Sequence, residues 1–110
     1  MSDSADEFVS LKAMHEIAVL LKEGGKPVAL LPAFTFTAGG RAETMDLLLV
    51  PFEHSGYTTR LFFERKVDSH GNNWRQHRVV DRNWWAPSWN NVPATLPWSA
   101  MLCAHLRAVA

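Results

Sequence analysis

The chain has 110 residues, 47% of them hydrophobic and 20% charged; this composition excludes a disordered protein and fits a single globular domain over residues 1–110. Eleven basic residues balance eleven acidic ones, so the net charge of zero disfavours nucleic acid and anionic membranes as partners. The single cysteine excludes an intramolecular disulfide. The acidic N-terminus and the lack of a long apolar run predict a cytoplasmic protein with no secretory signal and no membrane span.

An amphipathic helix is predicted over residues 4–23. Apolar side chains recur there at the three- and four-residue spacing of one helical face. Ser4 and Glu7 match a capping box at its start, and Gly24 with Gly25 supplies its end. We expect one face of this helix to pack against the rest of the domain.

A β-hairpin is predicted next, because the pattern changes to the two-residue period of strands. Its two strands cover residues 27–37 and 43–50, and Gly39 with Gly40 allows the turn between them. Pro32 cannot donate a hydrogen bond to a neighbouring strand. The first strand is therefore an edge strand, or it contains a bulge or a bent entry near Pro32.

Two further strands and an irregular segment follow. Alternation predicts a third strand over residues 57–67 and a short fourth strand over residues 74–80. The tryptophan-rich stretch, residues 83–91, is predicted to be a loop or a broken strand, because Pro87 and Pro93 interrupt regular pairing.

A closing helix is predicted over residues 95–110. Thr95 can cap it, and Pro97 suits its first turn. The order of elements is a helix, a three- to four-stranded antiparallel meander, an irregular segment and a second helix. This order indicates an α+β fold with the helices on one face of the sheet.

The most unusual feature is a cluster of three tryptophans between asparagines. Indole rings bury large apolar areas and keep an N–H donor, so the cluster fits either a partner-binding surface or anchors that hold an irregular segment on the core. Successive side chains of an extended chain point to opposite faces, so Trp84 and Trp85 cannot both face inward. The candidate binding site combines these tryptophans with nearby arginines: Trp84, Trp85, Trp89, Arg75, Arg78 and Arg82. Single-stranded RNA would suit Arg and Trp together, but acidic residues interleave with the basic ones.

The other reactive side chains indicate no metal or cofactor site. His70 and His77 lie seven residues apart, but zinc requires three or four ligands and no second compact pair is present. Cys103 lies within the apolar part of the last helix and is interpreted as a buried structural residue. The spacing of Cys103 and His105 places their side chains on different helical faces. The two Gly-Gly pairs lack the further residues of a phosphate-binding loop.

The order of elements resembles the ubiquitin-conjugating (E2) superfamily. The segment WAPSWNNVPATLPWSAMLCAHL is similar in layout to that family's tryptophan-x-proline segment and following helix, and YTTRLFFERKV is similar to a strand of its meander. The family's His-Pro-Asn signature is missing, with only HGNN in that region, and Cys103 lies in the wrong element to be the thioester-forming cysteine. The resemblance implies a divergent, conjugation-inactive relative of the kind found among bacterial ubiquitin-like pathway components. An unrelated α+β fold with the same order of elements is the alternative.

We therefore expect a small intracellular recognition module with a protein partner. The first alternative is a small-molecule-binding protein or an enzyme, with a cleft between the sheet and the tryptophan-rich loop and with His77, Glu64 or Asp81 as general acid or base. The second is a structural subunit whose exposed aromatic side chains are buried in a homo-oligomer.

Overall fold

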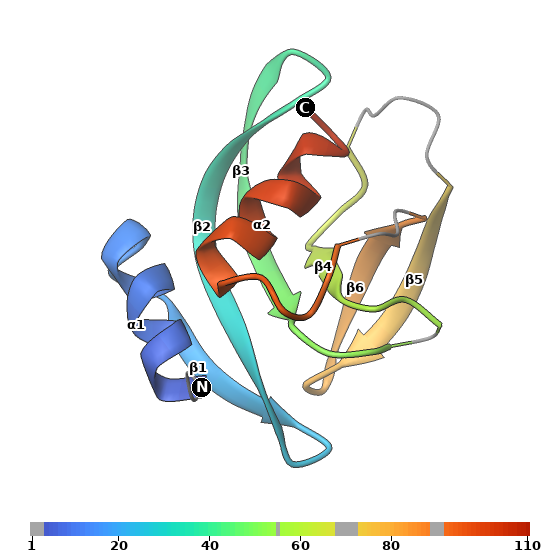
Figure 1. The fold of residues 1–110 in the computed structure, drawn as a ribbon. Coiled ribbons are helices and arrows are strands. Elements are labelled where there is room, and N and C mark those ends of the chain that lie inside the picture. The colour runs from blue at the N-terminus through green and yellow to red at the C-terminus, as the bar shows by residue number, and fades with distance from the viewer. Residues whose placement is uncertain (1–3, 55, 68–72, 89–91) are drawn as a thin grey trace.

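A computed structural model describes residues 4–54, 56–67, 73–88 and 92–110 (Figure 1). The elements are α1 (Ser4–Met14), β1 (Val19–Glu23), β2 (Lys26–Ala38), β3 (Arg41–Val50), β4 (Arg60–Phe63), β5 (Trp74–Val79), β6 (Arg82–Pro87) and α2 (Trp98–Arg107). The strands form one antiparallel sheet in the order β1-β2-β3-β4-β6-β5. The α+β class is confirmed, but the sheet has six strands in place of the three or four predicted.

The two helices lie on the same side of the sheet. In Figure 1, α2 crosses in front of the central strands and α1 lies beside β2, and the two helices pack against each other. The sheet order leaves β1 and β5 as its two edge strands. None of the helices in the described ranges is long and apolar enough to cross a membrane.

The predicted first helix is wrong over its second half. The helix ends at Met14, and the chain turns where the Ala18 N–H donates to the His15 carbonyl at 2.9 Å. Residues 19–23 then form β1 and pair with residues 26–30 of β2. The helical spacing of this segment is overridden because pairing with β2 satisfies its backbone groups.

Glycines permit the tight turn between β1 and β2. Glu23 pairs with Lys26, so only Gly24 and Gly25 connect the two strands, with φ of 59° and 82°. Positive φ at both positions is the requirement of the type I′ turn, which glycine meets without steric cost.

The hairpin of β2 and β3 is confirmed, and it contains a β-bulge at the proline. Leu31 pairs with Leu47 and Phe34 pairs with Met45, so Pro32 and Ala33 together oppose the single residue Asp46. Ala33 has a positive φ of 47°. Its N–H donates to the Asp46 carboxylate at 2.9 Å, and this bond replaces the ladder bond lost at the bulge.

The last three strands depart from the prediction in length and number. The third predicted strand shortens to Arg60–Phe63, the fourth is confirmed as Trp74–Val79, and the start of the tryptophan-rich stretch is a regular strand, Arg82–Pro87. Val80 and Asp81 form the turn before it, with φ of 47° and 59°. Positive φ is rare for valine, so sequence patterns gave no sign of this hairpin.

The second helix begins with a cap from another element. Pro97 precedes the first helical residue, and neither it nor the predicted cap Thr95 supplies a side-chain hydrogen bond there. Instead the Trp98 N–H donates to the Glu7 carboxylate of α1 at 3.0 Å. Glu7 therefore stabilises the positive end of α2.

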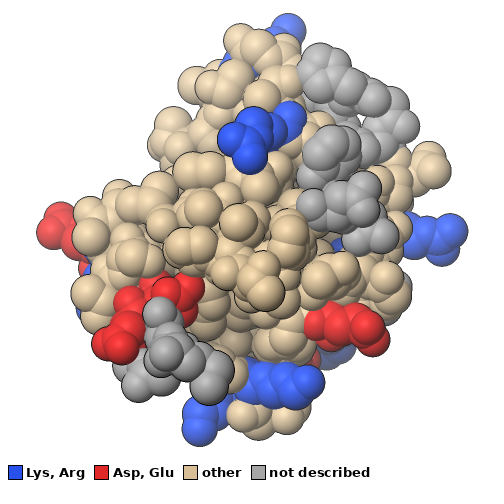
Figure 2. Space-filling model, viewed as in Figure 1, with Lys and Arg blue, Asp and Glu red and all other residues tan. Residues whose placement is uncertain are grey.

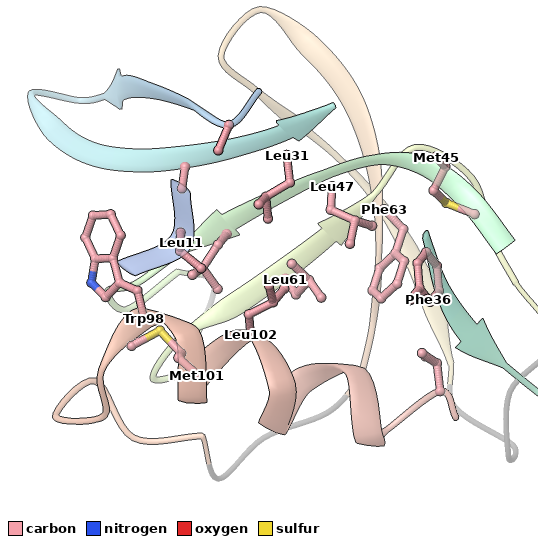
Figure 3. Packing of buried hydrophobic residues seen from close by; sticks show 14 of the residues in the cluster. Leu11, Leu31, Phe36, Met45, Leu47, Leu61, Phe63, Trp98, Met101 and Leu102 are labelled. Carbon is pink, nitrogen blue, oxygen red and sulfur yellow. The ribbon is translucent and has the colours of Figure 1, made fainter. Parts of the chain in front are cut away.

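Each face of the sheet carries a hydrophobic cluster. The first, here called the helix-side core, lies between the sheet and the helices, where Leu31, Leu47 and Leu61 point toward Leu102 and Leu11 (Figure 3). The second core, on the opposite face, consists of Val28, Leu48, Val50, Phe62, Val79, Trp84 and Ala86. The Val80 N–H, in the turn between β5 and β6, donates to the Glu23 carboxylate of β1 at 3.4 Å, so the two ends of the sheet curl toward each other around this core.

Candidate functional site

The adjacent tryptophans point to opposite faces of the sheet, as predicted. Trp84 lies opposite His77 in the second core and is 0% exposed, and its indole N–H donates to the Val79 carbonyl at 3.1 Å. Trp85 lies opposite Phe63 on the helix side and is half-buried. Trp84 is therefore a core anchor and is not available to a partner, whereas part of Trp85 is at the surface.

A lysine covers part of the accessible indole. The Lys66 ammonium lies 4.5 Å from the centre of the Trp85 ring. Such a cation–π contact occupies a ring face that a ligand would otherwise use. Trp89, the third member of the predicted cluster, lies outside the described residues.

The three predicted arginines do not form one surface. Arg75 and Arg78 are exposed, but an odd spacing in a strand directs them to opposite faces of β5. Arg82 pairs with Asp46 at 2.9 Å and lies 4.3 Å from the Trp84 ring. Of the three predicted arginines, Arg82 thus has a structural partner. Arg75 and Arg78 are exposed and form no ion pair within the described residues.

The buried guanidinium of Arg60 lies beside the Phe62 ring of the second core. Arg60 is 4% exposed and stacks on Tyr57, with the guanidinium carbon 4.1 Å from the ring centre. Within the described residues, its guanidinium donates one hydrogen bond, to the Pro87 carbonyl at 3.5 Å, and forms no ion pair. Arg60 therefore holds the segment before β4 against the sheet without a compensating carboxylate.

Two histidines pack beside this guanidinium. The rings of His54 and His77 lie 5.5 Å apart, and both contact Phe62. Burial and the charge of Arg60 lower the pKa of each histidine below its ordinary value of 6.5. The buried Nε2 atom of His77 has no hydrogen-bond partner. Both rings are thus held in the neutral form near pH 7.

The residues proposed as general acid or base do not come together with a defined geometry. Glu64 lies just after β4 and accepts a hydrogen bond from the Asp46 N–H at 2.9 Å. Asp81 is exposed in the turn between β5 and β6. His77 packs against Phe62 of the second core, and neither carboxylate is among the causes that lower its pKa.

His105 forms a buried link between α2 and the central part of the chain. Its Nε2 lies 2.8 Å from the Thr59 hydroxyl, and that hydroxyl donates to the Val92 carbonyl at 2.9 Å. The hydroxyl has one proton, so His105 must donate from Nε2 as a neutral ring. Burial, followed by the charge of Arg60, lowers the pKa of His105 to about 4.

The interpretation of Cys103 as a buried residue is wrong. Its side chain is exposed, and it borders an apolar hollow of about 350 Å³ between β2 and α2. The hollow is lined by Met14, Phe34, Thr35, Phe36, Thr37, Cys103, Leu106, Arg107 and Ala110. Figure 2 shows that the middle of this side of the molecule carries few charged side chains.

No metal-binding group of histidine, cysteine and carboxylate side chains occurs in the described part of the chain. His70, which with His77 forms the candidate pair of zinc ligands in the sequence, lies outside the described residues. The structure thus gives His77 a place among aromatic rings, with no nearby metal ligand set.

Sequence reasoning missed the most exposed apolar region. The exposed large hydrophobic side chains of the described residues all lie between residues 9 and 20, with 40% to 65% of their surface accessible: Val9, Met14, Ile17, Val19 and Leu20. We call residues 9–20 the α1–β1 segment. The helical prediction had placed several of these side chains in a buried stripe, which hid the signal.

The α1–β1 segment includes an open edge of the sheet. No described strand pairs with the outer side of β1. An edge strand offers unpaired N–H and C=O groups to another chain, and proteins normally protect such edges with charge, proline or a bulge. Residues 17–21 have none of these protections.

Comparison of the chain with protein-family models, with curated proteins and with solved structures finds no match.

Proposed function

We propose that this protein is a recognition module that binds another protein by strand addition at β1. The observation that carries the proposal is the gathering of all exposed large hydrophobic side chains of the described residues in the α1–β1 segment. Exposed apolar side chains are common singly, but a group of them beside an open sheet edge is typical of an interaction site.

Strand addition would use two kinds of contact. The main chain of β1 supplies hydrogen bonds to an extended partner, and these bonds supply affinity for any sequence. Val19 and Leu20 point to opposite faces of the sheet, so a bound strand would contact one of them on each side. The apolar character of both residues favours a partner strand with apolar residues at neighbouring positions.

The resemblance of the sequence to the ubiquitin-conjugating superfamily, which rests on the expected order of elements, points to the same class of function. On that basis we propose that the chain acts as a conjugation-inactive component of a ubiquitin-like pathway in the cytoplasm of a bacterium. Cys103 lies in α2, after the tryptophan segment, so a thioester role for it has no support. Trp85 and Arg78 on one face of the sheet, and Arg75 on the other, stay candidate contacts away from β1.

The test is selection of extended peptides from a random peptide library displayed on phage, with the purified protein as bait. Leu20→Lys places a charge on β1, and Arg78→Glu is the matched control on the other edge strand. Peptides that bind the original protein and the Arg78→Glu variant, but not Leu20→Lys, support strand addition at β1. If every selected peptide is lost with Arg78→Glu and kept with Leu20→Lys, the binding surface lies at β5 and the proposal fails.

A second candidate function is binding of a small apolar ligand. The hollow of about 350 Å³ between β2 and α2 favours it, because Phe34, Phe36 and Leu106 line its wall and Arg107 lies at its border. This arrangement suits a short hydrocarbon chain with an anionic group, at a place other than the predicted cleft beside the tryptophan-rich loop.

Decanoate titrated into the protein and followed by calorimetry tests this second function. Leu106→Trp would fill the hollow and should abolish binding, whereas Leu20→Lys should leave it unchanged. Equal heats for the original protein and Leu106→Trp would contradict a site in this hollow.

A further inference from the structure

We propose that the partner of β1 is a second copy of this chain, joined by antiparallel pairing of the two β1 strands about a two-fold axis at Leu20. The inference rests on the proposed function and names its partner. It follows from three features of β1: the direction of its backbone groups, the faces of its side chains and the position of its charges.

The two-residue turn after β1 sets the direction of its backbone groups. In such a hairpin the two residues that flank the turn, here Glu23 and Lys26, exchange hydrogen bonds. Backbone groups alternate along a strand, so Leu21 and Val19 also bond to β2. Leu20 and Lys22 therefore direct their N–H and C=O groups outward, toward the open edge.

Symmetry restricts how a second copy can pair. A two-fold axis perpendicular to the sheet keeps each copy's two faces aligned with those of the other copy. Opposed side chains then share a face only if the axis lies where one residue is paired with the same residue of the partner. An axis at Leu20 pairs Leu20 with the partner's Leu20, and Val19 with the partner's Leu21. Every residue in the centre of the new pair is then apolar.

The two neighbouring registers are less favourable. An axis at Leu21 places the Lys22 ammonium directly across from the partner's Leu20. An axis at Val19 pairs Lys22 with the partner's Glu16, which lies in a turn and not in an extended segment. Of these three axis positions, Leu20 is the one at which the paired residues are in extended backbone and the central pairs are apolar.

The hydrogen bonds of this register can be counted from the outward groups. The two Leu20 residues exchange two bonds across the axis. The Lys22 N–H of each copy meets the Ala18 carbonyl of the other, whereas the Ala18 N–H already donates to His15. The zero net charge of the chain adds no long-range repulsion between copies.

The same axis places both α1 helices on one face of the joined sheets. α1 lies on the same side of the sheet as α2, so the helices of both copies are on one side of the joined sheets.

Sedimentation of the original protein at increasing concentration tests the dimer. We expect a concentration-dependent shift from monomer to dimer. Leu20→Lys puts two ammonium groups at the axis and should weaken the dimer on the order of 100-fold, since like charges meet across the interface. Gln76→Lys, which adds the same charge at an exposed position of the other edge strand, should leave the dimer unchanged, and circular dichroism of each variant checks that it is folded.

Cysteine crosslinking tests the register. In a Cys103→Ser background, cysteines placed singly at Val19, Leu20, Leu21 and Lys22 should differ in how fast they form a covalent dimer, with Leu20→Cys fastest because it faces its own copy. Fastest crosslinking at another of these positions would overturn the proposed register.

Failure of this inference can be told apart from failure of the proposed function. A protein that is monomeric at every concentration, yet binds extended peptides in a manner lost with Leu20→Lys, overturns the dimer and leaves strand addition in place. A protein that does neither overturns both.

Discussion

The two edges of the sheet are built in opposite ways. On β5, Arg75 and Arg78 project from the strand to either side and are exposed. On β1 the exposed side chains at the start of the strand are Val19 and Leu20, and its charged residues are confined to the end next to the turn. Charge on an edge strand prevents the addition of further strands. The contrast indicates that β5 is protected and that β1 is the edge left open for a partner.

The two ends of the sheet also differ in how firmly they are anchored. Trp84 of β6 is fully buried and hydrogen-bonded, whereas β1 contributes only the half-buried Leu21 to the second core. A large buried ring fixes the charged end of the sheet, and a small aliphatic contact holds the open end. The open end is therefore expected to loosen first, and the following experiments test this contrast.

The largest expected effect comes from removing the buried indole. Trp84→Ala should lower the free energy of unfolding by about 4 kcal/mol, because it leaves a cavity in the second core and removes the indole hydrogen bond to the Val79 carbonyl. Leu21→Ala, the matched change at the other end, should cost roughly 1 kcal/mol, since half-burial limits the apolar area lost. Urea unfolding measures both values. Equal losses in the two variants would mean that the ends are anchored alike.

Acid should destabilise both ends together through His105. The folded protein holds this ring neutral, with its pKa lowered from 6.5 to about 4, so the unfolded chain binds a proton first as the pH falls. Stability is therefore full above about pH 6.5 and is lost progressively toward pH 4, by roughly 3 kcal/mol for this group. His105→Gln should remove that part of the pH dependence in urea titrations. An unchanged pH dependence in the variant would contradict the assignment.

A smaller acid effect should separate the two ends. His54 and His77 have lowered pKa values and lie beside β5 and β6, so their protonation below pH 6.5 destabilises that end of the sheet. Amide hydrogen exchange should accelerate at Trp84 between pH 6.5 and pH 5, after correction for intrinsic rates, with less change at Val28. His77→Leu is expected to weaken the acceleration. A uniform change across the sheet would assign the effect to His105 alone.

The smallest expected effect on stability comes from making the protected edge resemble the open one. Arg75→Val with Arg78→Val should change the free energy of unfolding by no more than about 0.5 kcal/mol, because both side chains are exposed. The change should nevertheless make β5 able to associate. Sedimentation in a Leu20→Lys background isolates the new edge. A monomer in this experiment would show that charge is not what protects β5.

Local sequence signals predicted the elements that depend on neighbouring residues. The hairpin around Gly39 and Gly40 was predicted because its turn requires glycine, and a bulge near Pro32 was among the options because proline cannot join a ladder. The segment 19–23 was predicted as helix because its spacing fits one, and only pairing with β2 makes it a strand. The turn at Val80 and Asp81 carries no glycine, so β6 was expected to be irregular.

The candidate site was predictable only in part. Alternation in an extended chain predicted that Trp84 and Trp85 face opposite ways, but which of them is buried depends on the distant Phe62 and Val79 of the second core. The exposed side chains at Val19 and Leu20 were hidden by a helical interpretation that assigned the segment a buried face. The sequence did indicate that some apolar side chains of the α1–β1 segment would be exposed, because they occupy more than one helical face and a helix buries only one.

The bulge at Pro32 and Ala33 changes the side-chain parity of β2. Before it, odd-numbered residues such as Leu31 face the helices, and after it the even-numbered Phe34 and Phe36 do. One thirteen-residue strand can therefore contribute side chains to the helix-side core along its whole length, although its apolar residues change from odd to even positions at the bulge. Deleting one of the two bulge residues would leave regular alternation, with Leu31 still opposite Leu47 and Phe34 still opposite Met45, so the strand could lose this irregularity without turning either phenylalanine away from the helix-side core.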